Sequence, residues 1–256
     1  MKQNKIELIV LGSGTCIPSK TRGAAGIIIK IDSEILLFDS GSGILNKLAI
    51  VDVDYRALKY LFYTHTHADH TSDLIPILQA INVSPNFKRT DSFHILGPPQ
   101  FYNFLEKLSQ AYGTWIIDPD FEIIIKEAYQ EQIEFPFGKI STAPMKHSIN
   151  SIGYRIDTTD NKSITYSGDT GYCEEIVKLA KDCDILILEC SMPDNQKMDG
   201  HLTPSLSATI AAESNCKHLI LTHFYPECEF VDIVSICKKI YHGKITLAYD
   251  LMREII

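Results

Sequence analysis

The 256-residue sequence predicts an α/β protein made of a single domain spanning residues 1–256. Short apolar segments rich in β-branched and aromatic residues alternate with amphipathic segments along the chain, and no linker separates them. A chain of this length can bury a full hydrophobic core, so its length requires no second domain. We therefore expect strands and helices to pack together as one unit.

Strands are expected where short apolar segments are bounded by Gly, Asp or Ser. These segments are residues 6–11, 26–31, 35–38, 60–63, 93–96, 122–125, 140–142, 151–156, 163–167, 185–189 and 219–222. Helices are expected where apolar residues recur about every 3.6 positions, and the second helix has a proline at its start. The predicted helices are residues 71–83, 98–112, 174–181, 205–214 and 230–240.

Two segments in the first half of the chain each resemble a segment in the second half. Residues 58–65 and 216–223 are apolar strands that both end in Thr-His, and Asp39 and Asp169 each follow an apolar strand in a similar turn. Such echoes suggest two similar halves whose strand ends converge on one edge, where a site can form.

Composition narrows the function classes. The chain has 24 Lys and Arg against 32 Asp and Glu, a formal net charge of -8, which argues against broad nucleic-acid or membrane binding. Its 7 cysteines form no C-x-x-C pair, which favours reduced thiols over a disulfide framework. No apolar stretch reaches membrane-spanning length, and no targeting segment begins between Met1 and Lys5. We expect a cytoplasmic protein with no membrane partner.

The most informative segment is H-T-H-A-D-H at residues 65–70, directly after an apolar strand. With 9 His in the chain, chance would produce H-x-H-x-D-H about once in a thousand such chains. Side chains two apart on an extended segment point the same way, so His65 and His67 can share one metal ion. The turn into the next helix would direct Asp69 and His70 toward a second ion. A capping role at that helix is the alternative for Asp69.

This motif resembles that of the metallo-β-lactamase superfamily, and His147, Asp169 and His223 match the remaining ligand positions of that superfamily in the same order. The resemblance implies a four-layer αβ/βα sandwich with two divalent metal ions. One ion would be bound by His65, His67 and His147, the other by Asp69, His70 and His223, and Asp169 would bridge both. Imidazole and carboxylate donors without a thiolate suit Zn²⁺, with Mn²⁺ or Fe as alternatives.

Further motifs resemble ribonuclease Z and its small relatives. They are Leu11-Gly12-Ser13-Gly14 with Pro18 and Arg22, Glu189, His201-Leu202-Thr203 and the closing Ala248-Tyr249-Asp250. In that branch the histidine of H-x-T acts at the leaving group with support from a glutamate, which implies these roles for His201 and Glu189. The implied function is hydrolysis of a phosphodiester by a hydroxide held between two zinc ions and oriented by Asp69. Dimers are common in that branch, so a homodimer is one expected assembly.

The sequence departs from ribonuclease Z in one large feature. That family carries a long arm, which grips transfer RNA, between the motifs matched here by His147 and Asp169, but only 21 residues separate them in this chain. Residue 188 is Leu, where ribonuclease Z usually has His. Together with the acidic net charge, these differences favour an armless relative that acts on an RNA 3′ end or on a small or cyclic phosphodiester.

Several alternatives remain at this stage. His201 could be a loop histidine that bonds a turn, Glu189 could cap a loop, and Asp39 is interpreted as structural support near the metals. Lactone, thioester or sulfate-ester hydrolases share the same ligands. An oxygen-reducing di-iron protein would carry Glu in place of His67, and a non-catalytic binding module would have no need of all seven ligands.

Overall fold

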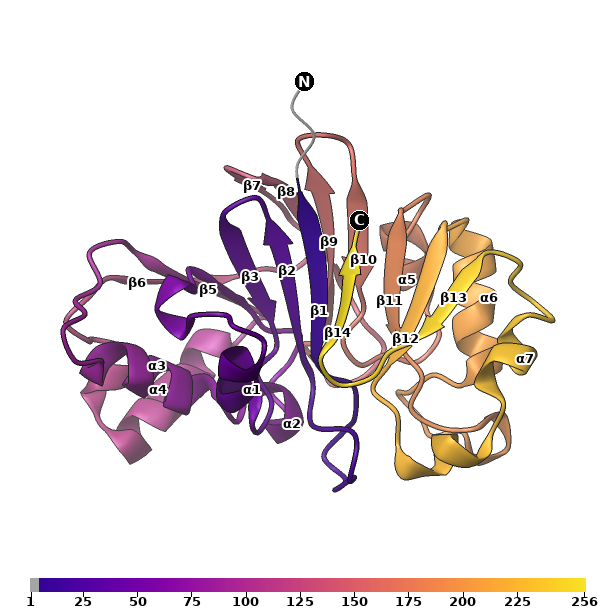
Figure 1. Ribbon diagram of the computed structural model, residues 1–256, viewed down its shortest axis with the longest axis horizontal. Coiled ribbons are helices and arrows are strands. Elements are labelled where there is room, and N and C mark those ends of the chain that lie inside the picture. The colour runs from indigo at the N-terminus through magenta and orange to yellow at the C-terminus, as the bar shows by residue number, and fades with distance from the viewer. Residues whose placement is uncertain (1–4) are drawn as a thin grey trace.

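The computed structural model describes residues 5–256, whose strands form two sheets of seven strands each (Figure 1). The first sheet has the order β14 (Met252–Ile255), β1 (Ile6–Gly12), β2 (Gly26–Ile31), β3 (Glu34–Phe38), β4 (Tyr60–Phe62), β5 (Phe93–Gly97) and β6 (Ile123–Glu127). The second sheet has the order β13 (Lys244–Leu247), β12 (His218–Thr222), β11 (Ile185–Glu189), β10 (Ser163–Tyr166), β9 (Ile152–Thr158), β8 (Gly138–Pro144) and β7 (Gln132–Phe135).

Helices cover the outer face of each sheet, and the two inner faces pack on each other (Figure 1). The first sheet is covered by α1 (Ile44–Ile50), α3 (Leu74–Val83) and α4 (Phe101–Tyr112). The second sheet is covered by α5 (Glu174–Leu179), α6 (Pro204–Ser214) and α7 (Ile233–Cys237). A cluster of buried apolar side chains fills each interface between neighbouring layers. The predicted four-layer αβ/βα sandwich is confirmed.

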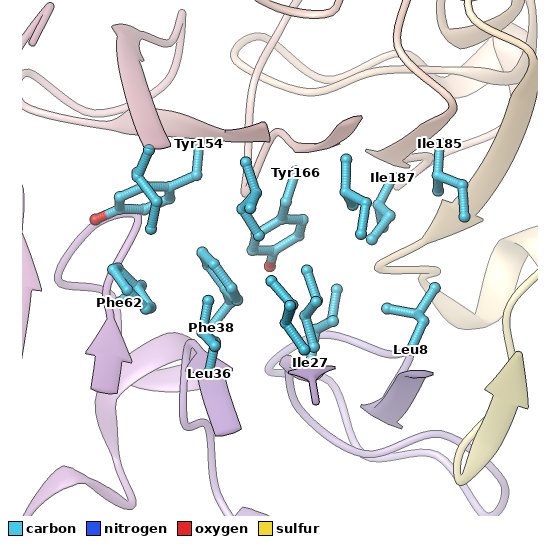
Figure 2. Close-up of a cluster of buried hydrophobic side chains, with 14 of the residues drawn as sticks. Leu8, Ile27, Leu36, Phe38, Phe62, Tyr154, Tyr166, Ile185 and Ile187 are labelled. Atoms are coloured by element: carbon cyan, nitrogen blue, oxygen red, sulfur yellow. The ribbon is translucent and has the colours of Figure 1, made fainter. Parts of the chain in front are cut away.

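The core between the sheets is rich in aromatic side chains. Alternate residues of each strand point to opposite faces, and because both faces are covered the strands are apolar along most of their length. Figure 2 shows Phe38 and Phe62 of the first sheet facing Tyr154 and Tyr166 of the second. The rings of Phe38 and Phe62 stack with centroids 4.6 Å apart, and Tyr154 meets Phe38 edge-on at 5.5 Å. The hydroxyl of Tyr166 donates to Asp39, so this packing continues into a polar region.

Parallel strands bring several chemically important residues to one edge. Strands β3 to β6 run parallel to one another, and so do β10 to β13. The carboxyl ends of parallel strands meet at the same edge of a sheet. Asp39 and His65 follow β3 and β4 of the first sheet, while Asp169 and His223 follow β10 and β12 of the second. The segments with similar sequences in the two halves of the chain therefore meet at the carboxyl ends of the parallel strands.

The prediction of one helix over residues 71–83 is wrong at its start. The structure has two helices there, α2 (Ala68–Thr71) and α3. Pro76 has no N–H to donate to the carbonyl four residues earlier, so a continuous helix is interrupted and Pro76 lies in the first turn of α3. Between the helices, Asp73 accepts hydrogen bonds from the backbone N–H groups of Gly43 and Leu45 at 3.1 and 2.7 Å. The break thus stabilises the start of α1.

Other element boundaries also differ from the predictions. The helix predicted over residues 98–112 begins at Phe101, because Gln100 has a left-handed backbone with φ of 70° and precedes it. The helix predicted over 230–240 is limited to α7, after a 3-10 turn at Pro226–Phe230. The sequence does not predict the elements β7, β13, β14 and α1. Each is short, and polar or charged residues interrupt the apolar pattern that would mark it as a strand or helix.

None of the helices within residues 5–256 is long and apolar enough to cross a membrane. The expectation that no targeting segment begins between Met1 and Lys5 falls mainly on residues 1–4, which lie outside the described residues.

Candidate metal centre

The H-x-H-x-D-H segment leaves β4 as an extended loop and then turns into α2. His67 has an extended backbone, with φ of -64° and ψ of 151°, whereas Asp69 and His70 lie within α2. His65 and His70 are buried, while His67 is exposed. The change from extended to helical backbone therefore presents donor atoms to two adjacent positions.

Four donor atoms converge in a first cluster, formed by His65, His67, His147 and Asp169. The Nδ1 atom of His67 lies 3.1 Å from the Nε2 atoms of both His65 and His147. The Oδ2 atom of Asp169 lies 3.7 Å from the same two Nε2 atoms. Tetrahedral ligands about 2.1 Å from a zinc ion are separated by about 3.4 Å, so these spacings suit one ion.

A second cluster, formed by Asp69, His70 and His223, adjoins the first. The Nε2 atom of His223 lies 3.3 Å from Nε2 of His70 and 3.4 Å from Oδ2 of Asp69. The remaining carboxylate oxygen of Asp169, Oδ1, lies 3.3 Å from both imidazole nitrogens. Asp169 thus directs one oxygen toward each cluster, as its predicted bridging role requires.

The Oδ1 atom of Asp169 is buried and has no hydrogen-bond partner in the part of the chain that the structure describes. An unpaired buried carboxylate oxygen is costly, and a cation between the donors would satisfy it. The donors are nitrogen and oxygen atoms, a set that suits Zn²⁺ and also accepts Mn²⁺ or Fe. The residues present therefore fit two divalent ions.

Four of these histidines have their second ring nitrogen held by a neighbouring group. The pairs are His65 with the Thr64 hydroxyl at 3.0 Å, His70 with Asp39 at 2.8 Å, His147 with the Gly200 carbonyl at 3.0 Å, and His223 with the Ser191 hydroxyl at 3.1 Å. Such contacts fix the tautomer and the ring orientation of a metal-binding histidine. The nitrogens that face the clusters are therefore preorganised.

Asp39 is the centre of this supporting network and supplies no atom to either cluster, in agreement with its interpretation as structural support. Its buried carboxylate accepts hydrogen bonds from the Thr64 N–H at 2.9 Å, the Tyr166 hydroxyl at 2.8 Å and His70. Asp39 and His223 both have left-handed backbones, with φ of 56° and 59°. Such strain outside glycine persists only where the surrounding contacts impose it, and it is concentrated at functional sites.

Burial and neighbouring charges set the protonation of the clusters. Burial, with His70 nearby, lowers the pKa of His65 well below its usual value, which favours the neutral imidazole that a metal requires. Burial opposes ionisation of Asp169, yet His223 and His70 hold the pKa of this carboxyl well below its usual range. Burial also opposes charge on His70, but Asp169 and Asp39 raise the pKa of that imidazole well above its usual value. These shifts favour a neutral His65 and an ionised Asp169, the protonation states in which both side chains can bind a cation.

His201 and Glu189 form a buried pair beside the clusters. The Nδ1 atom of His201 lies 2.9 Å from Oε1 of Glu189, and the His201 ring lies 4.7 Å from that of His147 between centroids. Burial lowers the pKa of His201, but Glu189 outweighs burial and raises it above the usual value. Because a His201 nitrogen also lies within 4.8 Å of donor atoms of Asp169 and His223, a ligand role is the alternative for His201.

Glu189 also fixes the loop that carries His201. It accepts hydrogen bonds from the Ser191 hydroxyl at 2.5 Å and from the backbone N–H groups of Thr170 and Leu202 at 2.6 and 3.1 Å. Glu189 therefore caps this loop, as the alternative interpretation states, and it also contacts His201.

The structure brings together all the site residues predicted from the sequence. They are His65, His67, Asp69, His70, His147, Asp169, Glu189, His201 and His223. Sequence reasoning missed Ser191 and Tyr166, which bond His223 and Asp39. Ser191 lies two residues after Glu189 and could have been found from that spacing, whereas Tyr166 is an ordinary strand residue in the sequence and carries no signal.

Residues 35–224 match the model of the beta-lactamase superfamily domain. The chain belongs to the beta-lactamase superfamily. The matched region of this superfamily member includes every predicted metal-binding residue, from His65 to His223.

Ribonuclease Z proteins are among the relatives of this beta-lactamase superfamily member. The chain is 31% identical over 248 residues to the mitochondrial ribonuclease Z of Drosophila melanogaster, a match that covers 87% of this chain and 32% of that protein. It thus spans about a third of that relative. It is 25% identical over 287 residues to the ribonuclease Z of Pyrococcus horikoshii, covering 91% and 92% of the two chains. The resemblance to ribonuclease Z that the sequence motifs predict is confirmed as a sequence similarity to these proteins.

Solved structures show the same beta-lactamase superfamily fold. The metallo-beta-lactamase fold protein YhfI of Bacillus subtilis superimposes with a TM-score of 0.84 at 21% identity, over 99% of this chain and 100% of that one. The likeness in fold therefore extends over all four layers of this chain.

Proposed function

We propose that the protein is a dinuclear-zinc phosphodiesterase of ribonuclease Z type. The observation that carries the proposal is the position of Asp169, whose two carboxylate oxygens face two adjacent donor clusters beside a buried His–Glu pair. One ion would be held by His65, His67 and His147, the other by Asp69, His70 and His223, with Asp169 shared. Bound zinc would lower the pKa of a water between the clusters and offset the charge of the phosphate oxygens.

The residues of the chain have distinct parts in this proposal. Asp69, which keeps 12% of its side chain exposed, orients the attacking water from the open side of the centre. His201 bonds Glu189 through Nδ1, which leaves Nε2 free to donate a proton to the departing oxygen. Glu189 orients His201 for that step and favours its protonated form, because the charge of Glu189 raises the pKa of the imidazole.

The substrate is proposed to be a short RNA 3′ end or a small or cyclic phosphodiester. Only β9 and β10, joined by a tight turn, lie between the segments that carry His147 and Asp169, so no arm projects there. The alignment with the Pyrococcus horikoshii ribonuclease Z is 287 positions long, more than the 256 residues of this chain, so that relative has residues for which this chain has no counterpart.

A substrate panel tests the proposal. Zinc- and manganese-loaded protein would be incubated with bis(p-nitrophenyl) phosphate, 2′,3′- and 3′,5′-cyclic nucleotides and a precursor transfer RNA with a 3′ trailer, with His67→Ala as control. We expect hydrolysis of phosphodiesters that depends on His67. No hydrolysis of any of them, together with turnover of lactones, thioesters or sulfate esters, would replace the proposal with one of those activities.

A further inference from the structure

A cavity of about 240 Å³ lies beside the His65 and His67 end of the metal centre. One wall is the loop after β5 together with α4, and the other is the loop that follows His147. The side-chain amide of Asn150 donates to the Pro99 carbonyl at 2.9 Å, which joins the two walls. The cavity is therefore a built part of the rim of the centre, although none of its α4 residues has a role in the proposed chemistry.

One face of α4 lines this cavity. Asn103, Phe104 and Lys107 are spaced at i, i+1 and i+4 on α4, which places them on one side of the helix, and all three line the cavity together with Gln100, the residue that precedes the helix. The opposite side is anchored in the core, where Phe101 stacks on a tyrosine ring with centroids 5.0 Å apart. The helix thus contributes two polar side chains and one aromatic ring to the cavity beside the donor clusters.

Lys107 supplies the charge of the cavity. Of the described residues, no Asp or Glu lines it, and Lys107 is its one Lys or Arg. Within residues 5–256, no hydrogen bond or ion pair reaches the exposed ammonium of Lys107. The positions three and four residues away on α4 carry no acid, so the helix itself offers Lys107 no partner. The chain as a whole has a net charge of -8, whereas the lining of this cavity carries one positive charge and no carboxylate.

The cavity on the Asp69 side of the centre differs in this respect. Its cation, Arg22, is already engaged by the protein, since it pairs with Glu229 at 2.6 Å and donates to the Ser13 hydroxyl at 2.8 Å and the Ala248 carbonyl at 2.7 Å. Arg22 therefore stabilises the fold there, whereas Lys107 is available to a ligand.

We propose that the cavity is a subsite for a second phosphate group of the substrate and that Lys107 determines the preference for it. This inference rests on the proposed phosphodiesterase function. A phosphodiester at the metal centre has two substituents, and a substituent that enters the cavity meets a lining that includes Phe104, the amides of Asn103 and Asn150, and Lys107. An ammonium group binds phosphate as a point charge, without the paired geometry that arginine imposes.

Matched substrates test the role of Lys107. The p-nitrophenyl ester of thymidine 5′-phosphate would be compared with the same ester carrying a 3′-phosphate, and the isomeric 3′-ester with and without a 5′-phosphate. For at least one pair, the second phosphate is expected to raise kcat/KM of zinc-loaded wild type about tenfold. Lys107→Ala should remove this gain and Lys107→Arg should keep most of it, while bis(p-nitrophenyl) phosphate turnover stays unchanged. Lys88→Ala, an exposed lysine elsewhere, is the control.

A binding measurement separates this inference from the proposed function. Calorimetry with the metal-loaded protein would compare thymidine 3′,5′-bisphosphate with the two thymidine monophosphates, and we expect the bisphosphate to bind about tenfold more tightly only when residue 107 is a cation. Hydrolysis of the esters without any preference that depends on Lys107 would overturn the subsite and leave the phosphodiesterase proposal intact. A bisphosphate preference that depends on Lys107 without hydrolysis would overturn only the proposed reaction. Equal binding of all three nucleotides by wild type would overturn the subsite whatever the activity.

Discussion

At the scale of single residues, His201 has the role with the clearest test. Its Nδ1 atom bonds Glu189, and one of its ring nitrogens lies within 4.8 Å of donor atoms of Asp169 and His223. We expect His201→Ala to lower kcat by a factor of about 10² to 10⁴, the usual contribution of a general acid, while two ions per chain are retained. Steady-state kinetics and elemental analysis of the same preparation check this. Loss of metal along with activity would show that His201 is a ligand or a structural support.

Asp39 allows a test of the network behind the metal centre. Asp39→Asn keeps the side-chain shape and tolerates the left-handed backbone, but it removes the charge that holds His70. The loss of such a supporting contact should weaken metal affinity about 10- to 100-fold, as measured by chelator competition. Asp52→Asn is a matched control, because Asp52 has nearly the same φ, 55°, and is exposed. Equal affinity in both variants would show that Asp39 has no influence on the ligands.

At the scale of elements, the starts of three parallel strands depend on Asp184. Its carboxylate accepts hydrogen bonds from the Ser163 N–H and the Lys217 ammonium, both at 2.8 Å, so it links the starts of β10, β11 and β12. Burial raises the pKa of Asp184, but the bonds from Lys217 and Ser163 lower it below its usual value. Since the folded pKa is below the unfolded one, this stabilisation exists above the ordinary carboxyl pKa and is lost as pH falls through the folded pKa.

We therefore expect Asp184→Asn to lower the free energy of unfolding by about 1 kcal/mol at neutral pH. The difference from wild type should shrink as the pH falls below about 4, where the carboxyl of the unfolded chain takes up a proton, and should be lost once the pH is below the lowered pKa of the folded protein. Urea unfolding at several pH values measures both effects, with the exposed Asp120→Asn as control. A difference that is independent of pH would mean that the charge of Asp184 contributes nothing.

Some of the helices and strands can be predicted from the sequence, and others cannot. The long apolar strands and the amphipathic α4 can be predicted because their periods are local properties of the sequence. The break between α2 and α3 was not predicted, although Pro76 signalled it, because the apolar period continues through residues 71–83. The start of α1 depends on Asp73, which lies thirty positions from Gly43 in the sequence, and no local pattern shows this contact.

In the site, the side chains that could bind metal can be predicted from the sequence, but the residues that hold those side chains in place cannot. His65, His67 and Asp69 form a recognisable motif because one short loop must supply several donors at fixed spacing. The contact of Tyr166 with Asp39 crosses between the two sheets, over 127 positions of sequence, so it depends on the fold as a whole. Such long-range contacts become visible only once the layers are placed.

At the scale of the whole molecule, the short connection between His147 and Asp169 and the acidic net charge limit how the protein can grip a large RNA. We expect kcat/KM for a precursor transfer RNA to lie within about threefold of that for a short oligonucleotide with the same cleavage junction, since only the junction would contact the protein. Parallel assays at one salt concentration measure the ratio. A preference of tenfold or more for the full transfer RNA would show that another surface replaces the arm.

The metal content of the purified protein is the most direct test of whether the two donor clusters hold two metal ions. After saturation with zinc and removal of free ions, elemental analysis should give two ions per chain for wild type and one for His67→Ala, which removes a donor from the first cluster alone. Two ions in wild type and one in the variant would support both sites. A wild-type protein that retains no ion, or a variant that retains both, would show that the clusters are not two metal sites of this kind.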